Sequence, residues 1–212
     1  MTPEAFVAAH TVPGTAPLVP EITLLLASEI TPIWQASEAW LQREGVAPPF
    51  WAFAWPGAQA LARFVLDAPG AVRGRRVLDF AAGGGLAAIA CARAGATVET
   101  AELDPLATAA CHANAALNGV TLTAHTGDLV GRDDGWDLIL CGDVCYEAPM
   151  TRHILPWLRA LAQRAAVWIA DPGRAYLPTD GMERLATFDV PTTLELEDRD
   201  VRRTTIFRLQ PV

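Results

Sequence analysis

The sequence predicts an α/β protein with a seven-stranded, mostly parallel sheet, helices on both faces and a C-terminal antiparallel β-hairpin. Between residues 75 and 170, β-rich and helical runs alternate, which is typical of a parallel sheet covered by helices. Two further β-rich runs, 192–198 and 201–209, are separated by a charged turn, so one of them is expected to run antiparallel. At 212 residues, the chain has the size of one structural unit.

Residues 1–56 are expected to form a helical and aromatic extension that covers a pocket, ahead of the main domain at 57–212. The apolar run 22–28 fits either a strand or a short helix. Residues 32–44 have apolar side chains at helical spacing. Residues 48–56 hold four aromatic side chains between prolines, which indicates an ordered loop.

The elements of the main domain follow from the period of the apolar residues and from helix-start signals. Pro105 favours a helix start, with Asp104 as its cap. The expected order is helix 57–66, strand 75–80, helix 85–94, strand 97–102, helix 105–118, strand 121–125, strand 136–142, helix 149–163, strand 165–170 and helix 178–188.

Composition narrows the class of protein. The net charge is −8, all sixteen basic residues are arginine, and we attribute the lack of lysine to genome composition. An acidic chain is a poor partner for nucleic acid and suits a lysine-bearing protein. The four cysteines fall inside predicted elements without metal-site spacing, and no run reaches the roughly 20 apolar residues of a membrane span. We therefore expect a cytoplasmic protein without a bound metal.

A glycine-rich turn is the most informative motif. Strand 75–80 leads into Gly83 and Gly85, and a helix follows, an arrangement that lets backbone approach a nucleotide-like ligand. The third glycine of a dinucleotide fingerprint is replaced by Ala88. Asp79 is expected to point a negative charge into the pocket, which would repel a pyrophosphate and attract an ammonium and a sulfonium group. The turn therefore favours S-adenosyl-L-methionine as the cofactor, although a purely structural turn is the alternative.

Acidic residues follow the next strands of the expected sheet. Glu102 is positioned to accept from the ribose hydroxyls, with Asp104 as the alternative acceptor. Asp128 either accepts from the adenine amino group or caps its own turn. Because strand ends meet at one edge of such a sheet, these side chains and Asp143 should converge on the cofactor.

The candidate catalytic residues end the buried strand 136–142. Asp143 would orient an incoming ammonium and help to remove its proton, Tyr146 would form an aromatic wall, and Glu147 adds a second acid. Trp55 either contacts the cofactor or packs in the core, and Arg174 is expected to shape the substrate entrance.

Together these residues resemble the seven-β-strand, class I methyltransferases, which have a Rossmann-like fold. More narrowly, the Asp-x-x-Tyr motif from Asp143 to Tyr146 resembles that of lysine methyltransferases. Trp-Pro-Gly-Ala-Gln-Ala-Leu at 55–61 and Asp-Pro-Gly-Arg at 171–174 are most similar to the electron transfer flavoprotein β-subunit lysine methyltransferase family. The resemblance implies S-adenosyl-L-methionine as cofactor and a lysine of that flavoprotein subunit as acceptor.

Two residues depart from that pattern. Ala81 stands where the motif usually has its first glycine, and Glu102 replaces the more usual aspartate. We expect both departures to leave cofactor binding intact.

Other functions remain open at this point. A small-molecule N-methyltransferase would have a closed apolar cavity, whereas a protein methyltransferase, acting on the flavoprotein or on another protein such as a ribosomal one, needs an open acidic groove. A non-catalytic module would have a degraded cofactor pocket. An NAD-dependent oxidoreductase is disfavoured by Asp79.

Overall fold

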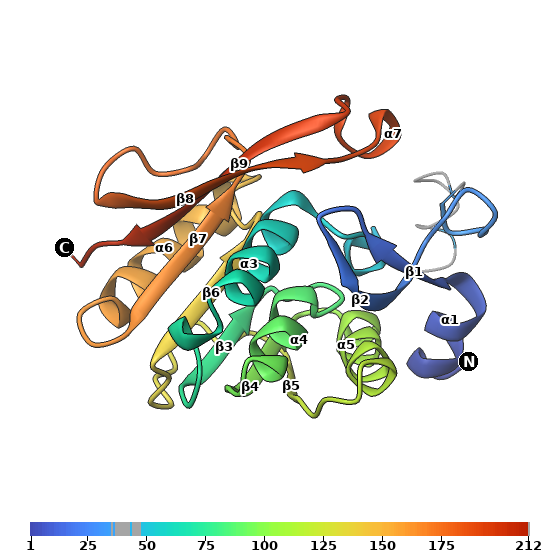
Figure 1. The fold of residues 1–212 in the computed structure, drawn as a ribbon, viewed down its shortest axis with the longest axis horizontal. Coiled ribbons are helices and arrows are strands. Elements are labelled where there is room, and N and C mark those ends of the chain that lie inside the picture. The colour runs from blue at the N-terminus through green and yellow to red at the C-terminus, as the bar shows by residue number, and fades with distance from the viewer. Residues whose placement is uncertain (35, 37–42, 44–47, 212) are drawn as a thin grey trace.

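The computed structural model describes residues 1–34, 36, 43 and 48–211, and its centre is a seven-stranded sheet (Figure 1). The strands are, in chain order, β3 (Arg76–Phe80), β4 (Thr97–Glu102), β5 (Thr123–Thr126), β6 (Leu138–Gly142), β7 (Ala166–Asp171), β8 (Met182–Pro191) and β9 (Val201–Leu209).

The spatial order of these strands is β5-β4-β3-β6-β7-β9-β8. Neighbours from β5 to β7 are parallel, while β9 pairs antiparallel with both β7 and β8. The order reverses between β3 and β6, which places the ends of these two strands at a switch point of the sheet, where ligands bind in this class of fold. The predicted Rossmann-like architecture, with its C-terminal antiparallel hairpin, is confirmed.

Helices cover both faces of the sheet. In Figure 1, α3 (Pro56–Asp67), α4 (Leu86–Arg93) and α5 (Pro105–Leu117) lie in front of the sheet, and α6 (Ala148–Leu161) lies behind it. Successive strand residues point to opposite faces, and the core divides accordingly. Val77 packs with α3 and α4, whereas its neighbour Leu78 packs with α6.

The C-terminal elements differ from the expectation. The predicted helix 178–188 is wrong, because Met182–Pro191 is strand β8, paired with β9 along its length. The predicted strand 192–198 is also wrong, since that segment contains the short helix α7 (Leu194–Glu197). Pairing with β9 outweighs the local helix preference of residues such as Met, Glu, Arg and Leu, because strand formation depends on cross-strand partners.

The N-terminal segment contains elements that the sequence did not predict. Helix α1 (Pro3–His10) precedes an antiparallel hairpin of β1 (Val12–Ala16) and β2 (Val19–Leu26), so the run 22–28 is largely strand. The predicted helix 32–44 lies mostly outside the described residues.

The aromatic loop and the turn after α3 each contain a short 3-10 helix. The first, η1 (Phe50–Ala52), lies in the ordered loop that the sequence predicted. The second, η2 (Pro69–Ala71), connects α3 to β3.

Two asparagines of the α5 region hold the hairpin against the domain. The Asn114 side chain accepts from the backbone N–H of Leu25, at 2.7 Å, and donates to the carbonyl of Gly84, at 2.8 Å. Asn118 accepts from the N–H of Thr23 and donates to its carbonyl. Asn114 therefore links the hairpin directly to the glycine turn.

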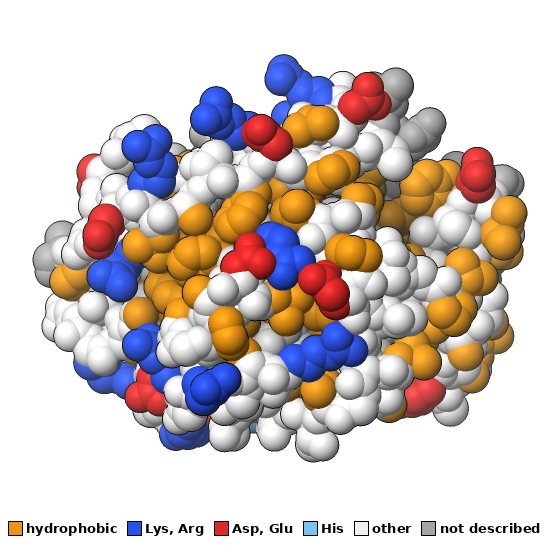
Figure 2. Space-filling view, in the orientation of Figure 1, with side chains coloured by type: hydrophobic (Ala, Val, Ile, Leu, Met, Phe, Trp, Pro, Cys, Tyr) orange, Lys and Arg blue, Asp and Glu red, His pale blue; other side chains and the backbone are white. Residues whose placement is uncertain are grey.

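The surface carries charges of both signs. On the face that bears α3 and α4, acidic and basic side chains are interspersed among apolar ones (Figure 2). Arg63 of α3 pairs with Glu21 of β2 and with Asp67, which ties the hairpin to that helix. Within the described residues, no helix is both long and apolar enough to cross a bilayer.

Candidate active site

A cavity of about 670 Å³ opens at the carboxyl ends of the parallel strands, and this volume suits a cofactor-sized ligand. Its walls come from the aromatic loop, the glycine turn, the ends of β4 and β6, and the start of α6. The predicted site residues that line it are Trp55, Gly83, Glu102, Asp128, Asp143, Tyr146, Glu147 and Arg174. Asp79 and Gly85 do not line it.

The glycine turn adopts the backbone that the motif requires. Gly83 and Gly85 have φ of 56° and 79°, in the left-handed region that glycine enters without a steric penalty. Ala81, which replaces the first glycine, has φ of 54° and pays a cost of roughly 1–2 kcal/mol for that conformation. The turn thus keeps its shape without the first glycine. Gly85 shapes this turn as the residue before α4 and does not form the cavity wall.

The structure corrects the expected role of Asp79. Its carboxylate is 3 % exposed and accepts from the N–H of Ala88, at 2.9 Å, in the first turns of α4. Burial raises the pKa of Asp79 to about 7, an effect opposed by the Ala88 N–H and supported by the nearby charge of Glu102. Asp79 therefore anchors α4 to β3 behind the cavity and does not point into it.

Glu102 ends β4 beside the glycine turn. One carboxylate oxygen accepts from the N–H of Gly83, at 2.5 Å, and the other from the N–H of Leu103, at 3.2 Å. Burial raises the pKa of Glu102 to about 7, against the lowering effect of these two N–H groups. Asp104 also lines the cavity, but it caps α5 by accepting from the N–H of Leu106. Glu102 is therefore the better placed of the two acids to receive ribose hydroxyls.

Asp128 caps its own turn, one of the two roles that the sequence left open for it, and it also faces the cavity. It lines the cavity, and one oxygen accepts from the N–H of Val130, at 2.9 Å, in its own turn. The other oxygen lies 2.7 Å from Nε2 of His153. The Val130 N–H and then His153 lower the pKa of Asp128. His153 also lines the cavity.

Asp143 lies at the end of β6 with φ of 55° and is 8 % exposed. Its Oδ2 accepts from the N–H of Gly57, at 2.5 Å, and its Oδ1 accepts from Nη2 of Arg174, at 2.8 Å. Burial raises the pKa of Asp143 to about 6, and Arg174 limits this rise. A Cβ at Gly57 would lie 2.5 Å from Asp143 Oδ2, so only glycine permits this approach. This contact explains the glycine of the Trp-Pro-Gly segment.

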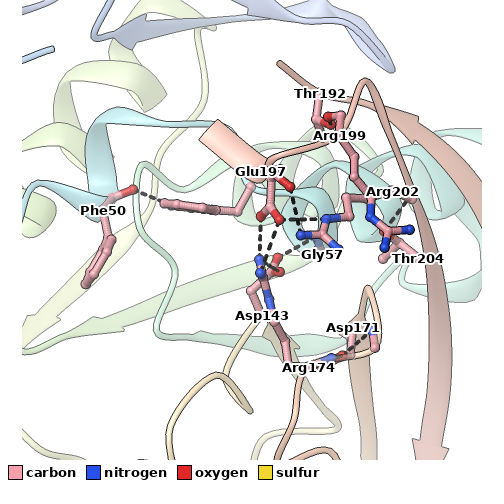
Figure 3. A network of polar contacts seen from close by, with 12 residues as sticks. Phe50, Gly57, Asp143, Asp171, Arg174, Thr192, Glu197, Arg199, Arg202 and Thr204 are labelled. Carbon is pink, nitrogen blue, oxygen red and sulfur yellow. Dashed lines mark hydrogen bonds and ion pairs between the residues drawn. The ribbon is translucent and has the colours of Figure 1, made fainter. Parts of the chain in front are cut away.

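Arg174 belongs to a larger network, drawn in Figure 3. It donates to both carboxylate oxygens of Glu197, at 2.5 and 3.2 Å. Glu197 lies on α7 and also accepts from Nε of Arg202, at 2.8 Å. The sequence did not predict roles for Glu197 or Arg202, because residues 192–198 were expected to form a strand and no motif marks them.

Aromatic side chains form one wall of the cavity. The Phe50 ring lies 5.9 Å from both Trp55 and Tyr146, measured between ring centroids. The Trp55 indole N–H donates to the Phe50 carbonyl, and the Arg174 guanidinium lies 6.0 Å from the Trp55 ring. Tyr146 is partly exposed beside the exposed Glu147, which precedes α6. The walls thus combine aromatic faces with carboxylates, a lining suited to a nucleoside that carries a positive charge.

Comparisons with known proteins identify the family. Residues 60–143 match the model of the ribosomal protein L11 methyltransferase (PrmA) family. The chain is 36 % identical over 219 residues to the electron transfer flavoprotein beta subunit lysine methyltransferase of Xenopus laevis, covering 99 % of this chain and 87 % of that one. This chain belongs to the electron transfer flavoprotein beta subunit lysine methyltransferase family. The human relative in this family is 31 % identical over 221 residues, covering 98 % of this chain and 82 % of its own.

Membership makes the protein a lysine methyltransferase that uses S-adenosyl-L-methionine, as the sequence predicted. The magnesium protoporphyrin IX methyltransferase of Synechocystis PCC 6803, solved with bound SAM, has a TM-score of 0.54 and 20 % identity, covering 72 % of this chain and 79 % of that chain. At this identity the likeness concerns the fold alone. The cavity volume, the glycine turn and the acid at the end of β4 fit this cofactor.

Proposed function

We propose that this protein transfers methyl groups to lysine side chains of an electron transfer flavoprotein β subunit. The observation that carries the proposal is identity of 36 % along nearly the whole chain to a methyltransferase named for that substrate. The site supports it, because one residue or more of each family motif lines the same cavity: Trp55, Asp143, Tyr146 and Arg174.

Each site residue has a role in this proposal. Glu102 accepts from the ribose hydroxyls, Asp128 accepts from the adenine amino group, and the backbone at Gly83 approaches the cofactor closely. Trp55 forms part of the cofactor pocket. The cofactor supplies an electrophilic methyl group on a sulfonium.

The acceptor enters past exposed groups at the cavity mouth. Tyr146 and Glu147 flank this entrance, and Asp143 lies further in, where it orients the acceptor nitrogen. Holding acceptor and donor in line is the main catalytic contribution of such a site, because the attack needs no covalent enzyme intermediate.

A protein acceptor fits this cavity better than a small metabolite does. Carboxylates of Glu102, Asp104, Asp128 and Glu147 stand among its lining groups, and the Phe50 and Tyr146 rings are exposed beside them. Exposed acidic and aromatic side chains beside the cavity suit a lysine on a protein surface, whereas a metabolite requires enclosure. We further propose that the enzyme acts in the cytoplasm, since its four cysteines are buried free thiols, as is common in a reducing compartment.

The test uses the purified enzyme, methyl-labelled S-adenosyl-L-methionine and a purified flavoprotein, followed by mass spectrometry of the β subunit. Because the chain contains no lysine, lysine label cannot arise from the enzyme itself. We expect label on β-subunit lysines, and a loss of about 10²-fold in kcat for Asp143→Asn, because the acceptor nitrogen is then oriented less well. Label found only on other proteins or on metabolites would contradict the proposed substrate. Full activity of Asp143→Asn would remove Asp143 from the mechanism.

A further inference from the structure

Asp143 is not a free carboxylate. Oδ2 is bound by the Gly57 N–H and Oδ1 by the Arg174 guanidinium. An acceptor nitrogen that approaches Asp143 therefore meets a cluster of two carboxylates, of Asp143 and Glu197, and two guanidinium groups, of Arg174 and Arg202, whose charges cancel. This differs from the single negative charge that the sequence suggested.

Arg174 is held both at its guanidinium and at its backbone. On one side it is bound to Glu197, whose side chain is 1 % exposed. Arg202 holds Glu197 in turn: its Nε donates to the Glu197 carboxylate and its Nη2 donates to the Glu197 backbone carbonyl, each at 2.8 Å. On the other side, the backbone N–H of Arg174 donates to Asp171 Oδ1, at 2.6 Å. Figure 3 shows the carboxylates of Glu197 and Asp143 next to the end of the Arg174 side chain, and both accept from Nη2. Because Glu197 is buried and doubly anchored, Arg174 has a partner even when Asp143 turns to an acceptor.

A fixed cation at this point has a chemical consequence. A lysine ammonium has a pKa of about 10.4 in water, so only a small fraction of it is a nucleophile near pH 7. A lone buried carboxylate would stabilise the ammonium and hold the acceptor in its unreactive form. A guanidinium beside that carboxylate opposes this stabilisation, because like charges disfavour the protonated amine.

We propose that Arg174 is a second charged group of the transfer site, which favours the neutral form of the acceptor amine, and that Glu197 and Arg202 are positioning residues for it. The inference rests on the proposed function, since it requires an amine acceptor. The acceptor proton leaves to water, and the nitrogen lone pair then forms the new N–C bond. As that bond forms, the S–C bond breaks and its electrons remain on sulfur.

Other ionisable groups lie around Asp143 and Arg174, and the test leaves them unchanged. They come from the end of β4, the segment between β6 and α6, and the end of β7, and they are Glu102, Cys145, Tyr146, Glu147 and Asp171.

The first measurement is the pH profile of kcat for methyl transfer to the flavoprotein. Arg174→Gln should move its midpoint upward by about one pH unit or more and lower kcat at pH 7 about tenfold, without raising KM. Arg174→Lys, which keeps the charge, should recover much of the loss. Arg152→Gln, an exposed residue of α6, is the control and should leave the profile unchanged. An unshifted profile in Arg174→Gln would overturn the inference.

Glu197 is tested through its dependence on Arg174. Glu197→Gln should lower kcat in the wild-type background and have no further effect in the Arg174→Gln background. Equal losses in both backgrounds would show that Glu197 acts independently of Arg174, and would overturn its positioning role.

A probe without the protein substrate separates this inference from the proposed function. n-Butylamine is an ammonium at pH 7, and calorimetry in the presence of S-adenosyl-L-homocysteine measures its affinity. Arg174→Gln should bind it about tenfold more tightly than the wild type, because the lone carboxylate then favours a cation. Equal affinities would overturn the inference. Tighter binding by the variant, with no label on the flavoprotein, would support the inference and reject only the substrate.

Discussion

At the scale of single residues, Glu102 connects the glycine turn to the sheet. Its carboxylate is already bound to the N–H groups of Gly83 and Leu103, and burial raises its pKa to about 7. Its charge therefore changes within the physiological pH range, at the point where the proposed ribose contact lies.

We predict that cofactor affinity depends on pH through Glu102. Ribose hydroxyls donate to the ionised carboxylate, so affinity should rise as the pH increases through about 7 and should fall by up to about tenfold per unit below it. Glu102→Gln should bind more weakly at pH 8 and lose most of this slope. Titration calorimetry with S-adenosyl-L-methionine at pH 6, 7 and 8 measures both effects, and equal slopes in the two proteins would contradict the prediction.

A second residue-scale prediction concerns the approach of α3 to Asp143, the proposed catalytic acid. In Gly57→Ala, the new methyl group would lie 2.5 Å from Asp143 Oδ2 and 2.6 Å from the carbonyl oxygen of Ala170, so β6 or α3 must shift. We expect a loss of at least about 2 kcal/mol in the free energy of unfolding, measured with urea, and a strong loss of methyl transfer. Gly70→Ala is the matched control, because its Cβ would meet nothing within 4 Å. Similar behaviour of the two variants would refute this account.

At the scale of elements, the β1–β2 hairpin and the glycine turn share one side chain. Asn114 is fully buried and satisfies both the Leu25 N–H and the Gly84 carbonyl. Nothing in the local sequence marks this contact, because its partners are 89 and 30 residues away. The sequence therefore predicted the glycine turn but not the hairpin that supports it.

We predict that Asn114→Ala lowers both stability and cofactor affinity. Two partly buried backbone groups lose their partners, each at a cost of up to about 1–3 kcal/mol in the free energy of unfolding, and the glycine turn loses its support. Asn118→Ala removes contacts between α5 and the hairpin at Thr23 but none to the glycine turn. It should lower thermal stability while leaving affinity for S-adenosyl-L-methionine near that of the wild type. An equal loss of affinity in both variants would argue against a direct link.

The C-terminal hairpin shows where element prediction fails. Residues of β8 have good helix propensity, and only their pairing with β9 makes them a strand. The same pairing places α7 so that Glu197 reaches Arg174. The charge network at the site could not be read from the sequence, because it depends on that non-local pairing.

At the scale of the whole molecule, burial of Asp79 makes stability depend on pH. Its pKa is raised to about 7 in the folded protein, so its contribution is greatest below the unfolded pKa of about 3.9 and is lost as pH rises through 7. Between pH 5 and pH 8 the wild type should lose on the order of 2–3 kcal/mol relative to Asp79→Asn. Urea unfolding at both values measures this. Asp189→Asn, at an exposed position of β8, should show the same pH dependence of the free energy of unfolding as the wild type. The same pH dependence in Asp79→Asn as in the wild type would refute the prediction.

The sequence by itself determined the class of fold, the cofactor and the family, because these depend on local signals: alternating apolar periods, a glycine turn after a strand, and short motifs at strand ends. Tertiary structure decided the charges of the site. The Asp79 side chain points toward α4 although this residue precedes the glycine turn in sequence. Asp143 forms an ion pair with Arg174, which also pairs with Glu197. The direction and pKa of a buried carboxylate depend on which distant groups surround it, and only the folded chain brings those groups together.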